Sequence, residues 1–215
     1  MEGQRKWVLT INSIFFSLIR ILFLVLPFNK LFTMKKVIIG SLVGGLLIFI
    51  WQTLSHVAFN LHEPVQQYTA KQDSILTYFK KIELEPGGYM LPRMSHNQSM
   101  EELEGFTKSI AGKPWGRVIY YPSYKTDMTM NMVRGFVLDV FMVFLLVWII
   151  SKLKIPRKST IVSISIVIGL IAFCNTSYTE HIWYPVFDLR AQLIDAVVAW
   201  GLCGIWLSRY FGQKN

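Results

Sequence analysis

Four long apolar runs constrain the fold of this 215-residue chain more than any other feature. A helix needs about 20 apolar residues to cross the roughly 30 Å hydrocarbon core of a membrane, and each run approaches that length. The runs cover residues 37–59, 133–151, 160–177 and 191–210. They predict an all-α membrane protein built on a four-helix transmembrane bundle, with the lipid bilayer as its surroundings.

The charged residues predict how these helices are oriented. The chain carries a formal net charge of +9, and its basic residues gather beside the apolar runs. The clusters are Lys30, Lys35 and Lys36, then Lys152, Lys154, Arg157 and Lys158, then Arg209 and Lys214. Basic residues mark the cytoplasmic ends of membrane helices, so both termini of the four-span unit are expected in the cytoplasm. The basic excess is therefore a topology signal, and no nucleic-acid partner is expected.

The long segment 60–132, between the first two spans, is expected on the opposite, extracytoplasmic side. It carries equal numbers of acidic and basic residues. A helical period runs from Glu63 to about Ile82, and Ser99-Met-Glu-Glu102 is a capping box that opens a second helix. Short strands are expected near Tyr89–Leu91 and Arg117–Tyr121. Residues 60–132 are thus predicted to form a small α+β domain.

Residues 1–33 allow three interpretations. Arg20 interrupts an apolar stretch, and Thr10, Ser13 and Ser17 recur with it on one helical face, which favours an amphipathic helix at the membrane surface. Met34-Lys35-Lys36 before an apolar run is equally typical of a translation start, which would make the first 33 residues a mis-annotated extension. A fifth span is favoured less than either.

Two aspartates, Asp139 and Asp195, lie inside apolar runs. A carboxylate in a spanning helix costs about 2.5–3.5 kcal/mol on insertion scales, so both are expected to have polar partners. Measured along the helices, several further polar residues fall near the same outer surface: His56, Gln52, Arg134 and Arg190. Just above them stand four more that could contribute: His62, Glu63, Glu180 and His181.

This predicted cluster has two interpretations. In one, His56, Asp139 and Asp195 form a metal or proton site, because imidazole and carboxylate are ligands that suit zinc and other divalent metals. In the other, which we favour, the aspartates bond to arginines, to backbone or to each other and hold the helices together. A divalent metal is the one cofactor this set suggests, and no motif assigns a catalytic residue.

Several stretches resemble landmarks of an uncharacterised family of small bacterial inner-membrane proteins. They are Gly40-x-x-x-Gly44-Gly-Leu-Leu-Ile-Phe-Ile-Trp51-x-x-x-Ser55-His56, Gly88-Tyr-Met-Leu-Pro92, Gly116-Arg-Val-Ile-Tyr-Tyr-Pro122, Val133-Arg-Gly-Phe-Val-Leu-Asp139 and Leu193-Ile-Asp195-Ala-x-x-x-Trp200. The resemblance runs from Met34 to the C-terminus. It implies four spans, an outer domain and a place in the inner membrane, and it brings no known activity.

The sequence favours a non-enzymatic accessory or scaffold protein, because no catalytic motif is found and the outer domain is suited to contacting other proteins. A membrane-protein partner or a second copy of the chain would then bind it. Two alternatives stay open. One is a membrane metal-binding protein or enzyme that uses the His/Asp cluster, and the other is a small transporter.

Overall fold

The computed structural model describes residues 32–95, 99–124, 127–154 and 156–213. Most of them are helical, and the chain divides into two compact units. We call residues Tyr68–Asp127 the insert, and the described residues before and after it the helical unit. The predictions for residues 1–33 fall almost wholly outside the described residues.

Four helical segments in the helical unit are long and apolar enough to cross a membrane. The first is α2, Met34–Thr53, which continues through a π-helical turn at Leu54–Ala58. The second is α5, Met128–Ser151. The third runs from α6, Lys158–Phe173, through a second π-helical turn, Cys174–Tyr178, into the short α7, Thr179–Trp183. The fourth is α8, Leu189–Phe211.

The helices extend beyond the predicted spans. The third continues to Trp183 instead of ending at 177, because the π-helical turn carries the backbone hydrogen bonding onward into α7. The second begins at Met128, within the segment predicted to belong to the outer domain. Helices can project past the apolar core into water as long as their own backbone hydrogen bonds persist, so hydropathy alone makes these two helices too short.

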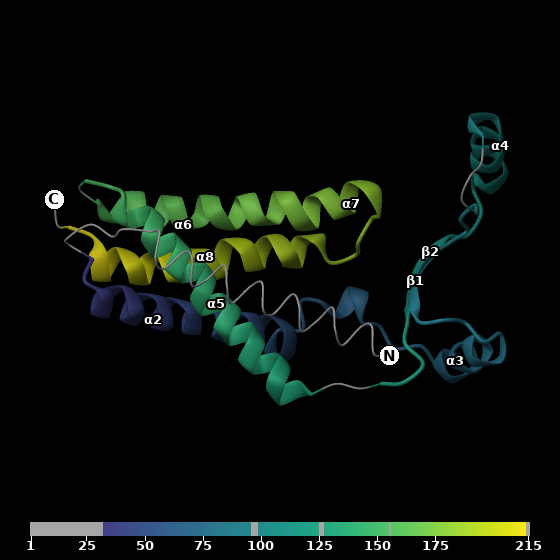
Figure 1. Cartoon of the computed structure of the whole chain (residues 1–215), viewed down its shortest axis with the longest axis horizontal. Coiled ribbons are helices and arrows are strands. Elements are labelled where there is room, and N and C mark those ends of the chain that lie inside the picture. The colour runs from purple at the N-terminus through teal and green to yellow at the C-terminus, as the bar shows by residue number, and fades with distance from the viewer. Residues whose placement is uncertain (1–31, 96–98, 125–126, 155, 214–215) are drawn as a thin grey trace. The chain divides into compact units, whose positions relative to one another are not determined.

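The helices α2 and α8 are the central elements of the helical unit. They pack against each other, α5 packs against α2, and α6 packs against α8. Figure 1 shows α6 and α8 side by side and α5 running obliquely across α2. Their shared core contains Val37, Ile48, Val143, Val147, Ile161, Cys203 and Leu207.

Close contact between α2 and α5 depends on glycine. A Cβ at Gly45 would lie 2.7 Å from the backbone Cα of Val140, and one at Gly44 would lie 2.7 Å from a methyl carbon of Val143. Small residues at such positions let membrane helices approach closely. Gly44 and Gly45 therefore give α2 a face against which α5 packs closely.

The insert holds two helices and two strands. They are α3, Gln72–Lys81, β1, Gly87–Leu91, α4, Met100–Ile110, and β2, Gly116–Tyr120. The strands pair antiparallel, with Gly87 opposite Tyr120 and Leu91 opposite Gly116. The capping box is confirmed, since Ser99 and Glu102 exchange hydrogen bonds at the start of α4. The helix expected from Glu63 begins only at Gln72, after a short 3-10 turn at Glu63–Val65 that contains Pro64.

Candidate functional site

The candidate site lies in the helical unit, where α2 ends and α8 begins. Beyond α2 the backbone NH of Phe59 bonds to Leu54 O at 2.8 Å, and that of Leu61 bonds to Ser55 O at 2.9 Å. Asn60 between them has φ of 48°, a left-handed conformation that asparagine tolerates better than most residues. The chain thus reverses, and the ring of His62 stacks on that of His56 with centroids 4.0 Å apart.

Two carboxylates come from the start of α8. Asp188 occupies the N-cap position and Asp195 follows two turns later, so both lie on one face of the helix. Gln192 lies between them on that face, and its Nε2 donates to Asp188 Oδ1 at 2.8 Å. A negative charge at the first turn of a helix is also favoured by the helix dipole.

His62 lies between these two carboxylates. Its Nδ1 is 2.8 Å from Asp188 Oδ2, and its Nε2 is 2.9 Å from Asp195 Oδ2. An ionised carboxylate can only accept hydrogen bonds, so both ring nitrogens carry hydrogen and the ring is an imidazolium. The side chain is buried, with 7% of His62 exposed.

The pKa shifts agree with this protonation state. Burial lowers the pKa of His62, but the hydrogen bonds to Asp188 and Asp195 outweigh it and leave that pKa raised. For Asp188 burial acts to raise the pKa, while the hydrogen bonds from His62 and Gln192 outweigh it and leave the pKa lowered. Both shifts favour the charged pair.

Adjacent residues of α2 bond to both aspartates of the spans. Trp51 Nε1 donates to Asp195 Oδ1 at 2.9 Å, and Gln52 Nε2 donates to Asp139 Oδ1 at 3.3 Å. Asp139 is only 2% exposed, and its Oδ2 has no hydrogen-bond partner among the described residues. One turn of α2 therefore links α8 on one side to α5 on the other.

His56 completes the group from the π-helical turn. Its Nδ1 lies 3.0 Å from the backbone carbonyl of Gln52, an oxygen that only accepts, so Nδ1 carries a hydrogen and Nε2 is the ring nitrogen left for another partner. His56 is exposed, unlike His62. One ligand atom from each of His56, His62 and Asp195 lies within 4.8 Å of the others.

The structure brings together only part of the predicted cluster. His56, Asp195 and Gln52 belong to it, while Asp139 is bonded to Gln52 alone. Arg134 and Arg190 are exposed, and within the described part of the chain no ion pair joins either to Asp139 or Asp195. The partners of the aspartates are thus a histidine, a tryptophan and a glutamine, in place of the expected arginines, backbone groups or each other.

From the sequence, His62 was expected just above the cluster and not at its centre, and Asp188 was not expected to belong to it. The spacing Asp188-x-x-x-Gln192-x-x-Asp195 was a usable signal, because residues at these intervals share one helix face. His181, which was expected near the cluster, instead accepts a hydrogen bond from the backbone NH of Val186 at 3.1 Å. That bond braces the turn between α7 and α8.

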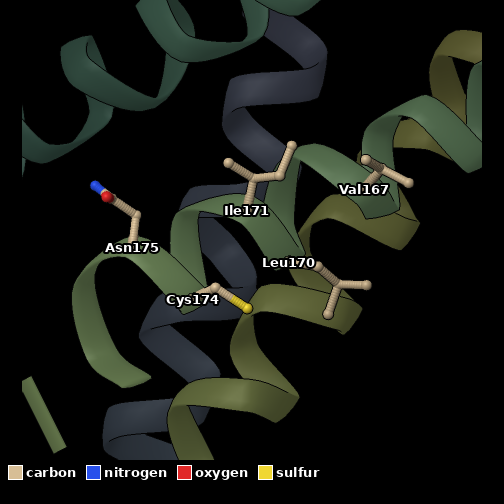
Figure 2. A pocket seen from close by; sticks show the side chains of 5 residues that line it. All are labelled: Val167, Leu170, Ile171, Cys174 and Asn175. Atoms are coloured by element: carbon tan, nitrogen blue, oxygen red, sulfur yellow. The ribbon is translucent and has the colours of Figure 1, made fainter. Parts of the chain in front are cut away.

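A shallow groove on α6 and the π-helical turn after it is separate from the His62 site. Val167, Leu170, Ile171, Cys174 and Asn175 line it, and Figure 2 shows Asn175 pointing away from the helix. Its lining is mostly apolar and its polar groups do not converge. Such a surface is typical of a helix face that meets lipid.

Comparison of the chain with models of protein families, with curated proteins and with solved structures gave no match. The resemblance to a bacterial inner-membrane family therefore stays a prediction.

Proposed function

We propose that this chain is a multi-pass protein of a bacterial inner membrane that acts as an accessory or scaffold protein. In this proposal the insert and the His62 site face the extracytoplasmic side, and the insert binds the extracytoplasmic part of a membrane-protein partner. The observation that carries the proposal is the pair of uncovered apolar helix faces in the insert.

The orientation follows from the basic residues. Lys35 and Lys36 stand at the start of α2, and Lys152 and Lys154 follow the end of α5. With these residues in the cytoplasm, the opposite ends of α2 and α5, and the insert that joins them, lie outside. The same reasoning puts the end of α8, with Arg209, in the cytoplasm.

The apolar faces belong to α3 and α4. Ile75 and Leu76 are exposed on one side of α3, and Ile82 is exposed directly after its last residue. Met100 and Leu103 are exposed on one side of α4. Among the described residues of the insert only Tyr120 is buried, against the ring of Phe79. Ordering a chain costs about 1–2 kcal/mol per residue, and one buried ring offsets little of that. Docking against a partner would supply the missing burial.

The charges on α4 favour a protein partner over a lipid surface. Helices that lie on membranes carry Lys and Arg on their polar face, which attract anionic lipid. The polar face of α4 instead carries Glu101, Glu102 and Glu104 against a single Lys108. Anionic headgroups would repel such a face.

Site-specific photo-crosslinking in native cells tests this proposal. A photoreactive residue replaces Leu76 or Leu103 on the apolar faces, and matched controls carry it at Asp73 on α3 or Glu104 on α4. We expect both apolar positions, and neither control, to capture the same membrane protein. When that protein is tagged in turn, it should bring down this chain in a fixed ratio, and Leu76→Ser with Leu103→Ser should abolish the complex.

Three outcomes would contradict the proposal. Crosslinks confined to this chain would mean that the insert covers its own faces. Crosslinks to a second copy would indicate a homo-oligomer instead of an accessory subunit. Crosslinks to lipid, or equal capture at apolar and control positions, would mean that no specific partner binds there.

A further inference from the structure

We propose that His56, His62 and Asp195 bind one divalent transition-metal ion of the zinc class. This inference goes beyond the accessory function and rests on contacts within the helical unit alone. The Nε2 atom of His62 and Oδ2 of Asp195 are already 2.9 Å apart, and the three ligand atoms lie within 4.8 Å of one another.

The second polar atom of each ligand is fixed by a partner. Asp188 accepts from Nδ1 of His62 at 2.8 Å, and the Gln52 carbonyl accepts from Nδ1 of His56 at 3.0 Å. Trp51 donates to Oδ1 of Asp195 at 2.9 Å. Metal-binding histidines commonly donate their other ring NH to a carboxylate or carbonyl, which fixes the tautomer and the ring orientation. Here the same pattern leaves three atoms for one ion: Nε2 of His56, Nε2 of His62 and Oδ2 of Asp195.

Charge balance favours an ion at this position. Without metal, one imidazolium lies between two carboxylates, which leaves a net charge of −1 in a mostly buried group. When a divalent ion binds, the Nε2 proton of His62 leaves to solvent and the ring becomes a neutral ligand. Two carboxylates and one divalent cation then sum to zero, and Asp188 keeps its bond to Nδ1.

One side chain must move to close the site. Zinc holds nitrogen and oxygen ligands at about 2.0–2.2 Å, so ligand atoms as far apart as 4.8 Å must come closer. His56 is the one that can move, because it is exposed and held by one hydrogen bond, while His62 is held at both nitrogens. Three protein ligands leave a fourth position for water or another small ligand.

The donor set selects the class of ion. Two imidazoles with one carboxylate suit zinc and its neighbours in the transition series, whereas magnesium and calcium prefer oxygen ligands throughout. A purely structural Asp188–His62–Asp195 clamp would make no use of His56. The role of His56 therefore separates a metal site from a clamp.

Cobalt titration of the full-length protein tests the proposal. The protein is purified in detergent with a histidine-free tag, stripped with a chelator, and titrated with Co²⁺, whose visible absorption reports coordination; Zn²⁺ is then added as a competitor. We expect one ion per chain, displaced by zinc. Both His56→Ala and Asp195→Asn should abolish tight binding, and Asp188→Asn should weaken it by about 10–100-fold as the loss of a supporting hydrogen bond does.

Two controls keep the result interpretable. His181→Gln changes a histidine outside the cluster, and Asp139→Asn changes a buried carboxylate outside it; both should bind cobalt as the unchanged chain does. His56 is exposed, so its alanine variant should unfold at the original temperature when metal-free, and zinc should raise that temperature only when His56 is present. Absence of saturable binding, or unchanged affinity in His56→Ala, would overturn the proposal.

Discussion

His62 Nδ1 and Asp188 Oδ2 are joined by a 2.8 Å hydrogen bond that spans 126 positions of sequence. The bond connects the chain just beyond α2 to the first residue before α8, so it ties the first and last helices of the helical unit together. With the 2.9 Å bond from Nε2 to Asp195, it holds the imidazole at both nitrogens. Polar contacts thus fix the end of the helical unit where α2 ends and α8 begins, while apolar side chains pack its middle.

Removing the imidazole should destabilise the helical unit. His62→Ala leaves two carboxylates without their cation, and breaking a fully buried pair costs about 3–5 kcal/mol. Because 18% of the Asp195 side chain is exposed, we expect a smaller loss, about 2–3 kcal/mol. Unfolding of the metal-free protein in mixed detergent micelles measures this loss of stability. His56→Ala, a substitution at an exposed residue, is the control. Equal stability of the two variants would contradict the clamp.

Trp51→Phe should also destabilise the helical unit, but by less than His62→Ala does. It keeps an aromatic ring and removes the indole NH that donates to Asp195 Oδ1. Hydrogen bonds to charged groups contribute about 1.5–3 kcal/mol, and we expect the lower end because the carboxylate keeps its bond to His62. In a double-mutant cycle with Asp195→Ala, which removes the acceptor, the two losses should be less than additive. Full additivity would show that the two side chains do not interact.

Asp139→Asn should leave the protein as stable or make it more stable. Asp139 is 2% exposed, and among the residues that the structure describes it has one hydrogen bond, from Gln52, and no partner at Oδ2. Asparagine can still accept from Gln52 and carries no charge to bury. Thermal unfolding in detergent checks this. A marked loss of stability would mean that the carboxylate has a partner or a role that the bond to Gln52 does not describe.

Glycine substitutions should separate packed from open helix faces. Gly45→Ala places a methyl 2.7 Å from the Val140 backbone, which cannot yield without moving α2 from α5. Overpacking of this kind costs about 1–3 kcal/mol. Nothing lies within 4 Å of a Cβ at Gly201, so Gly201→Ala should be neutral or slightly stabilising because alanine favours helix. Melting temperatures of the two variants should therefore differ, and equal values would contradict the close α2–α5 contact.

The sequence predicts the helices well and the site only in part. Hydropathy finds the four apolar helices because a long apolar run has few other uses. Two glycines of α8 show the limit, because nothing lies within 4 Å of a Cβ at Gly201, whereas a Cβ at Gly204 would lie 2.8 Å from the Cβ of Ser165. Residue type alone does not say which side of a helix its neighbour covers.

The composition of the site depends on contacts between distant segments. Asp139 and Asp195 stand out because charges are rare in apolar runs, but their partners come from a turn and from neighbouring helices. The stacking of His62 on His56 depends on a π-helical turn and on the left-handed Asn60, neither of which hydropathy reveals. Asp188 looks like an ordinary loop residue until α8 is seen to start immediately after it.

The proposed function has one premise, which is that the insert and the His62 site face the outside of the cell. Labelling of single cysteines in intact cells with a membrane-impermeant thiol reagent tests it most directly. Exposed Cys174 is replaced by serine, buried Cys203 can stay, and a new cysteine is placed at Tyr124 in the insert or at Lys154 between α5 and α6. We expect labelling at 124 in intact cells and at 154 only after the membrane is opened. Labelling at 154 but not at 124 in intact cells would contradict it.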